Sequence, residues 1–492
     1  MSSIQKYNFW FITGSQHLYG KEALLKVAQD ADEITNGLNA SGRLPCKVVS
    51  KGVVTTTDEI TAVMEQASYD KSCAGVITWM HTFSPSKMWI TGLSRLTKPY
   101  LHFHTQFNRD IPFETIDMDF MNLNQSAHGD REHGFIGARM RLARKIIAGY
   151  WGDPKVQERV GGFMRSAVGV MESRSLKVVR FGDNMRQVAV TEGDKVEAEI
   201  KLGWSINTMG VGDLVAEINK VTDAQIDAVY EQYKEKYVIN TDNIDSIRVQ
   251  IKYEIALKAI FDEGGFGAFT NTFEDLYGME QLPGIATQRM LEQGYGYGGE
   301  GDWKTSAMVR IMKQMAQGLE GGTGFMEDYT YHLDPANPLI LGAHMLEVCP
   351  TFAAEKPRVE VHELGIGGKN PPARLVFDGM EGDAIAVTLI DMGGRMRLIV
   401  NDIKAVKPIA PMPKLPVARV MWKPLPDLQT AAEAWILVGG AHHTCVSFAL
   451  TAEHMRDWAQ MMDIEFVHIG EKTDLNELSK ELMWNDIAFK LK

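Results

Sequence analysis

The chain has 492 residues, of which 45% are hydrophobic and 23% are charged. This length exceeds what one hydrophobic core supports, so we expect two or three domains, and the composition is ordinary for a soluble globular protein. The net charge of −12 and the lack of a basic stripe argue against a nucleic-acid-binding protein.

The first 150 or so residues alternate between strand and helix patterns. Short apolar runs predict strands at 7–13, 47–54, 74–79 and 100–104, and apolar residues at helical spacing predict helices at 22–38, 58–67 and 87–96. Such alternation needs crossover connections, so the sheet should be parallel with helices on both faces. We therefore predict a doubly wound α/β domain at residues 1–175. A further long helix is expected from near Gly129 towards Tyr150.

Two more domains are expected after this one. Residues 176–322 mix strand and helix patterns and predict a central α/β domain, in which Asp302 would cap a helix with a buried apolar stripe. Residues 323–492 are β-rich, with a hairpin signal at Met392-Gly393-Gly394 between apolar runs. No Gly-x-Gly-x-x-Gly follows the first strand and no P-loop motif occurs, so a nucleotide cofactor is not expected.

The cysteines and the N-terminus indicate the compartment. The four cysteines are scattered without a Cys-x-x-Cys pair, which is typical of reduced thiols. The first residues, Met-Ser-Ser-Ile-Gln-Lys-Tyr-Asn, lack the apolar core of a signal peptide. No run approaches the roughly 18 apolar residues that a membrane span needs. We expect a cytoplasmic protein that does not associate with membranes.

Two glutamates stand in unusual settings. Glu300 lies in Gly298-Gly299-Glu300-Gly301-Asp302, just before the predicted helix, where glycines let the backbone approach a ligand and the helix N-terminus favours an ionised carboxylate. A solvated loop carboxylate is the alternative. Glu327 lies in Phe325-Met326-Glu327-Asp328-Tyr329, where an extended chain puts it on an aromatic face. A carboxylate there must be paired or metal-bound, so a structural ion pair is the alternative.

Histidines follow these glutamates. His344 lies in an apolar run, where a hydrogen-bonded core histidine is the alternative, and Glu347 three residues on is a rival ligand. His442 and His443 are adjacent, and on an extended chain their rings would point in opposite directions. At most one of them would then normally bind a metal, with the other touching substrate. Spacing alone does not choose between these candidates.

A set of paired carboxylates and paired imidazoles suits one divalent cation such as Mn²⁺, Co²⁺ or Fe²⁺, with open positions for substrate oxygens. The set contains no thiolate, which argues against a closed structural zinc site. Two carboxylates at one cation could move a proton between adjacent carbons of a sugar. Elsewhere, Gln16 would suit sugar hydroxyls, and His128 is a candidate binding residue, for which helix capping or surface pairing is the alternative.

Several segments together make the chain resemble the L-arabinose isomerase family over essentially its whole length. Their order and spacing are more specific than any one of them. The segments are GSQHLYG at 14–20, HTFSP at 81–85, DMDFMNLNQ at 117–125, RFGDNMR at 180–186, GEGDWK at 299–304, FMEDYT at 325–330, HMLEVCP at 344–350 and GAHHT at 440–444.

The resemblance implies a specific site. Its divalent-metal ligands fall on Glu300, Glu327, His344 and His443, with one Mn²⁺ per subunit and Co²⁺ or Fe²⁺ as substitutes. The two glutamates would also be the catalytic acid/base pair. Gln16, Met185, His128 and His442 would belong to the substrate pocket. The family is typically hexameric, with the His128 position serving a neighbouring subunit's site. Its third domain is β-barrel-like.

The resemblance also implies an activity. We expect isomerisation of L-arabinose to L-ribulose by metal-assisted proton transfer through a cis-enediol, with slower conversion of D-galactose to D-tagatose. A fucose-type isomerase of another aldose would share this chemistry, and a panel of aldoses would separate the two. A non-catalytic sugar-binding protein would suit the first domain, although the paired glutamates argue against it. A metal-dependent hydrolase lacks support, because no His-Glu-x-x-His motif is present.

Overall fold

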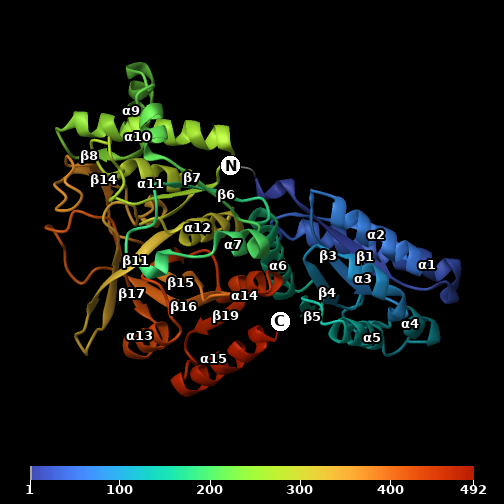
Figure 1. The fold of residues 1–492 in the computed structure, drawn as a ribbon. Coiled ribbons are helices and arrows are strands. Elements are labelled where there is room, and N and C mark those ends of the chain that lie inside the picture. The colour runs from blue at the N-terminus through green and yellow to red at the C-terminus, as the bar shows by residue number, and fades with distance from the viewer. Residues whose placement is uncertain (1–2, 492) are drawn as a thin grey trace. The chain divides into compact units, whose positions relative to one another are not determined.

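The computed structural model describes residues 3–491, which form two compact units (Figure 1). The first unit runs to Met171 and includes Arg456–Asp463. The second comprises Glu172–Met455 and the chain from Ile464 onwards. Among the residues described, no helix is both long enough and apolar enough to cross a membrane.

The first unit is built on a five-stranded parallel sheet with the order β2-β1-β3-β4-β5. Its strands are β1 (Asn8–Gly14), β2 (Lys47–Val54), β3 (Cys73–Met80), β4 (Tyr100–His104) and β5 (Lys145–Ala148). Its helices are α1 (Gly20–Ala40), α2 (Thr57–Tyr69), α3 (Ile90–Arg95), α4 (Met118–Leu123), α5 (Ser126–Arg139) and most of α6 (Pro154–Ser173).

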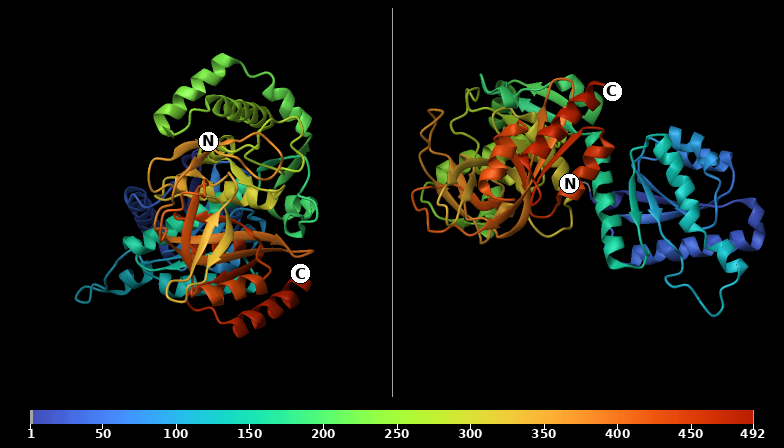
Figure 2. Two further views of the ribbon diagram at one scale, coloured as in Figure 1. Left: turned by 90° about the vertical axis from the view of Figure 1, so that its left-hand side faces the viewer. Right: turned by 90° about the horizontal axis from the view of Figure 1, so that it is seen from below.

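Side-chain alternation along β1 explains why both faces of this sheet are covered. Phe9 and Phe11 pack into a core with residues of α1 and α6. Trp10 and Ile12 point to the other face and pack with residues of α2, α3 and α5. A strand that is apolar at every position is stable only between two helix layers. The helices on both faces are visible in Figures 1 and 2, and the predicted doubly wound α/β fold is confirmed.

The predicted long helix towards Tyr150 was wrong. Helix α5 ends at Arg139, and Arg141 then adopts a positive φ of 54°, which ends helical geometry. The apolar residues that follow form the short edge strand β5. The three apolar residues Ile146-Ile147-Ala148 fit either a helix or a strand, so periodicity could not separate the two.

The second unit begins with a four-stranded parallel sheet of order β10-β9-β6-β7. Its strands are β6 (Lys177–Phe181), β7 (Ser205–Met209), β9 (Ala268–Asn271) and β10 (Gly296–Gly298). The helices of this part are α7 (Lys195–Leu202), α8 (Val211–Ile218), α9 (Asp223–Lys236), α10 (Ile244–Gly264), α11 (Ile285–Glu292) and α12 (Trp303–Met315). Asp302 caps α12, as predicted, and the apolar stripe of α12 is buried.

The C-terminal part is a mostly antiparallel sheet of order β15-β18-β11-β12-β17-β16-β19. An additional β15–β16 pairing closes six of these strands into a ring, as the barrel-like expectation requires. The strands are β11 (Thr323–His332), β12 (Leu339–Ala343), β15 (Gly382–Asp391), β16 (Met396–Val406), β17 (Arg419–Pro424), β18 (His443–Ser447) and β19 (Glu465–Ile469). The helices are α13 (Leu428–Leu437), α14 (Ala452–Met461), whose end belongs to the first unit, and α15 (Leu475–Lys490).

A small sheet links the central and C-terminal parts. Strand β8 (Val238–Ile239) pairs with β13 (Arg358–Val361), which pairs with β14 (Ala373–Val376). The predicted hairpin is confirmed, because β15 and β16 pair in register on either side of Met392-Gly393-Gly394, and both glycines have positive φ. We retain the domain divisions after residues 175 and 322 as proposals.

Candidate active site

Four of the predicted site residues converge in the second unit. Glu327 lies on β11, where it is paired with Ala343 at the end of β12 and with His443 at the start of β18. His344 follows β12 directly. Because β11 lies between β12 and β18, strand pairing alone brings these three side chains together. Glu300 reaches them from the turn between β10 and α12.

The ligand atoms of this cluster lie at distances that suit one cation. Among residues 3–491, Glu300, His344 and His443 form a group whose potential ligand atoms all lie within 4.8 Å of one another. The Nε2 of His344 lies 3.8 Å from a carboxylate oxygen of Glu327, and the Nε2 of His443 lies 3.8 Å from one of Glu300. These separations exceed hydrogen bonds, so the atoms face one another across a gap.

His443 is oriented by a buried carboxylate. Its ring is fully buried, and its Nδ1 donates to Oδ2 of Asp302 at 3.1 Å. Its Nε2 has no hydrogen-bond partner among residues 3–491. Buried polar atoms are nearly always paired, and metal-binding histidines commonly donate their other N–H to a carboxylate. The orphaned nitrogen, set opposite a carboxylate, therefore fits a cation.

His344 has a similar partner. Its Nδ1 lies 2.5 Å from an oxygen of Glu347, which also accepts a hydrogen bond from the backbone N–H of Leu346 at 2.9 Å. Tyr297 donates to the other oxygen of Glu347 at 3.4 Å. Glu347, which spacing alone left open as a ligand, is thus engaged with the Nδ1 side of the His344 ring. The Nε2 side of the ring faces Glu327.

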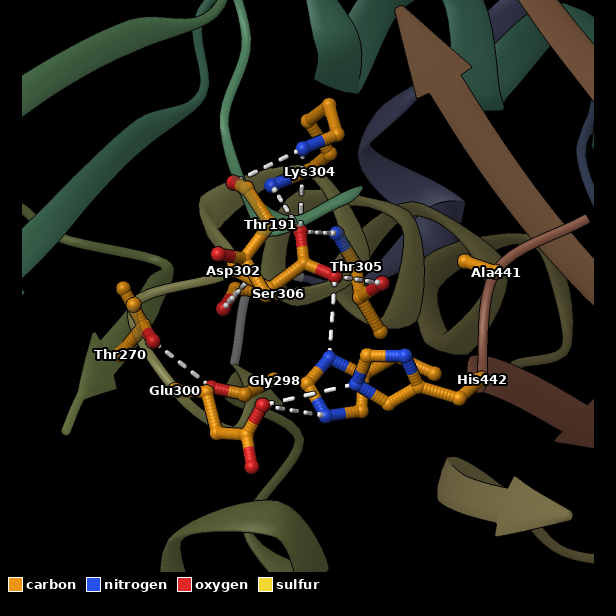
Figure 3. A network of polar contacts seen from close by, with 12 residues as sticks. Thr191, Thr270, Gly298, Glu300, Asp302, Lys304, Thr305, Ser306, Ala441 and His442 are labelled. Carbon is orange, nitrogen blue, oxygen red and sulfur yellow. Dashed lines mark hydrogen bonds and ion pairs between the residues drawn. The ribbon is translucent and has the colours of Figure 1, made fainter. Parts of the chain in front are cut away.

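The expectation that His442 and His443 point in opposite directions was wrong. His442 lies in a bend ahead of β18, where the alternation of an extended strand does not apply. The two ring centroids are 4.2 Å apart. The Nε2 of His442 lies 3.4 Å from an oxygen of Glu300 (Figure 3). Both imidazoles therefore meet the same carboxylate.

Glu300 is held in a strained backbone conformation. Its φ is 61° and that of Gly301 is 78°, and a non-glycine residue in this left-handed region costs roughly 1–2 kcal/mol. Three backbone hydrogen bonds fix the turn: Gly301 N–H to Asn271, Asp302 N–H to Gly299, and Met185 N–H to Glu300. A Cβ at Gly299 would lie 3.1 Å from the His344 ring, so this glycine permits the close approach.

The charges of the cluster are mutually dependent. Burial raises the pKa of Glu300, but the hydrogen bond from His442 and the nearby His443 and His344 outweigh burial, so that pKa lies below its usual value. The hydrogen bond to Glu300 is the main reason that the pKa of His442 is raised. Burial lowers the pKa of His344, but Glu347, together with Glu327 and Glu300, outweighs burial and the net shift is upward. Glu300 is therefore ionised at neutral pH, as an anionic ligand must be.

A cavity of about 280 Å³ opens beside the cluster. Carboxylates and an imidazole form one part of its lining, and apolar side chains form another, which is the usual composition of a small-molecule site. The lining includes Glu300, Glu327, Tyr329, His344, Glu347, Phe273, Leu276, Leu282 and Ile366.

The predicted substrate-pocket residues are divided between the two units. Met185 and His442 belong to the second unit, where the Met185 backbone N–H donates to Glu300 at 2.9 Å. Gln16 and His128 belong to the first unit. Gln16 follows the carboxyl end of β1, and His128 is exposed on α5 with its ring stacked on Phe83 at 5.3 Å.

Two contributors were missed as parts of the site. Asp302 was predicted only as a helix cap, and the buried Lys304 beside it was not singled out. The sequence does show a second carboxylate, Asp302, two residues after Glu300. Its partner His443, however, lies 141 positions further along the chain. No local pattern encodes that contact.

Comparison with known proteins covers nearly the whole chain. Residues 3–175, 177–318 and 322–465 match, in order, the N-terminal, central and C-terminal domains described for L-arabinose isomerase. L-arabinose isomerase of Geobacillus stearothermophilus is 60% identical over 100% of both chains. That of Thermotoga maritima is 56% identical over 100% of this chain and 99% of its own.

Proposed function

The chain belongs to the L-arabinose isomerase family of aldose–ketose isomerases, and on that premise we propose that it interconverts L-arabinose and L-ribulose. The observation that carries the proposal is the meeting of two carboxylates and two imidazoles, with Glu300, Glu327 and His344 of this set lining one cavity. We also propose slower conversion of D-galactose to D-tagatose, since the two aldoses differ only beyond the carbons that react.

Glu300, Glu327, His344 and His443 would hold one Mn²⁺, with Co²⁺ or Fe²⁺ as substitutes. The orphaned Nε2 of His443 and the absence of thiolates from the set support this choice. When bound, such a cation supplies Lewis-acid stabilisation of negative charge on the substrate's carbonyl oxygen. Asp302 and Glu347 would orient the two imidazoles.

The two glutamates would carry the proton transfers. One carboxylate removes the proton from C2 of the open-chain aldose, which leaves a cis-enediol in its deprotonated, enediolate form, and a proton is then delivered to C1. The other moves the hydroxyl proton from O2 to O1, so that C2 becomes the ketone carbon. Each transfer is general acid–base catalysis by a positioned carboxylate. The apolar wall of the cavity would limit the access of water.

Gln16, His128, Met185 and His442 would bind the sugar hydroxyls and carbon chain. The proximity of His442 and of the Met185 backbone to Glu300 supports two of these roles. For His128 we propose that it serves the site of a neighbouring subunit in a homohexamer; its exposure on α5 is compatible with such a role. We propose a cytoplasmic location.

The test is ketose formation from L-arabinose by metal-stripped protein, with and without added Mn²⁺. Restoration of L-ribulose production by Mn²⁺ is expected. Equal activity without metal would overturn the metal assignment. Metal-dependent activity on another aldose but not on L-arabinose would keep the chemistry and replace the substrate.

A further inference from the structure

Lys304 is a buried cation in the first turn of α12, with 1% of its surface exposed. A positive charge is unfavourable at a helix N-terminus, where the backbone N–H groups already present positive partial charge. A buried ammonium group is also costly unless it is paired and hydrogen-bonded. Residues that break a local rule in this way are expected at functional sites. The contacts of Lys304 indicate what its side chain does.

The first contact is with the carboxylate that orients His443. The Nζ of Lys304 lies 3.5 Å from Oδ1 of Asp302 (Figure 3). The other oxygen of Asp302 accepts the hydrogen bond from Nδ1 of His443 at 3.1 Å. Lys304 is therefore one side chain removed from a proposed metal ligand.

The second contact is with a loop that borders the site. The Nζ of Lys304 donates to the backbone carbonyls of Thr191 and Glu192, at 2.9 and 2.5 Å. The side-chain amide of Asn184 also donates to Thr191, at 2.6 Å, and to Gly301, at 3.1 Å. The loop 184–192 is thus tied to the turn that carries Glu300.

We propose that Lys304 is a positioning residue whose single ammonium group holds the Asp302–His443 pair and the loop 184–192 in one arrangement. This inference rests on the proposed function, since it takes His443 as a metal ligand and Met185, in the loop, as part of the substrate pocket. The loop and the metal centre would therefore be ordered together. Lys304 itself touches neither substrate nor metal.

The test compares Lys304→Met with Lys313→Met in the full chain. Lys313 is the matched control, because it lies on the same helix and also donates to a backbone carbonyl, that of Thr323, without contacting Asp302. Besides activity, we would measure the Mn²⁺ dissociation constant by electron paramagnetic resonance and the deuterium uptake of the segment 184–192 in metal-free protein. The number of imidazole nitrogens coupled to Mn²⁺ is counted by pulsed resonance on the same samples.

Lys304→Met is expected to weaken Mn²⁺ binding by roughly 10- to 100-fold, the usual effect of losing a partner behind a metal ligand. It should also lose coupling from one imidazole nitrogen, speed deuterium uptake in 184–192 and raise KM. Lys313→Met should match the wild type in all of these. The proposal is overturned if Lys304→Met binds Mn²⁺ as tightly as the wild type does and takes up deuterium in 184–192 at the wild-type rate.

A second variant covers the case in which Lys304→Met does not fold. Lys304→Gln keeps a donor for the Thr191 carbonyl but removes the charge beside Asp302, so it should weaken Mn²⁺ binding while leaving uptake of the loop closer to wild type. An unchanged Mn²⁺ affinity in Lys304→Gln overturns the part of the proposal that concerns the metal site. If these effects appear but the wild-type protein does not act on L-arabinose, the proposed substrate fails and the positioning role stands.

Discussion

Asp302 accepts a hydrogen bond from the Nδ1 of His443, 141 residues further along the chain, while its other oxygen caps helix α12. A carboxylate can only accept, so the hydrogen of the neutral ring is on Nδ1 and the lone pair is on Nε2. Burial raises the pKa of Asp302, but Lys304 and His443 outweigh it, so the pKa lies well below its usual value. One side chain therefore starts a helix and sets the tautomer of a candidate ligand.

Removal of either glutamate's charge should stop turnover. We expect Glu300→Gln and Glu327→Gln each to lower kcat for L-arabinose by ~10²–10⁴-fold, because each substitution removes a proton-transfer group and an anionic ligand. L-ribulose formation under saturating Mn²⁺ measures this. Glu320→Gln, which changes an exposed carboxylate, is the control and should retain full activity. Substantial turnover by Glu300→Gln or Glu327→Gln would contradict the assignment of these glutamates as the acid/base pair.

Mn²⁺ should stabilise the folded protein. A ligand that binds only the folded state adds ~2.7 kcal/mol to the free energy of unfolding at about 100 times its dissociation constant. We therefore expect a higher thermal midpoint when Mn²⁺ is added to stripped protein. In His443→Asn, which loses the orphaned nitrogen, the increase should largely disappear, whereas His332→Gln, on the exposed end of β11, should keep it. An equal increase in His443→Asn contradicts the ligand assignment.

Gly301→Ala should damage both stability and activity. Gly301 has a φ of 78°, and an added Cβ would lie 2.5 Å from the backbone of Asn184. The conformation alone costs roughly 1–2 kcal/mol, and the clash displaces the turn that carries Glu300. Chemical denaturation and kcat measure the two effects. Gly212→Ala, in helix α8 with open space around it, should instead be neutral or slightly stabilising. Similar behaviour of the two variants would contradict this account.

The first unit should lose the stabilising contribution of His104 at alkaline pH. Its hydrogen bond to Asp130, at 2.6 Å, raises the pKa of His104 above 6.5. Because the folded state holds this proton more tightly, the stabilisation is fully present below the unfolded pKa and is lost as the pH rises through the folded pKa. Thermal midpoints between about pH 6 and about pH 9 should therefore fall more in wild type than in His104→Gln. Identical pH profiles would refute the assignment.

The periodic apolar patterns predicted the fold closely where elements are long. Helix 22–38 and strand 47–54 correspond to α1 (Gly20–Ala40) and β2 (Lys47–Val54). Burial of one helix face imposes a repeat that the chain itself displays, and a β-strand gathers apolar residues into a short run. The edge strand β5 was missed because its three apolar residues are too few to display a distinctive repeat.

The sequence by itself determined the α/β fold class, the family and the residue types of the candidate site, because periodicity and short motifs are local properties. Tertiary structure alone decided which side chains meet. Strand pairing sets Glu327 beside His443, the bend before β18 turns His442 towards Glu300 across 142 residues, and the β10–α12 turn delivers Asp302 to His443. Such contacts depend on how distant segments pack, and no local repeat in the chain records them.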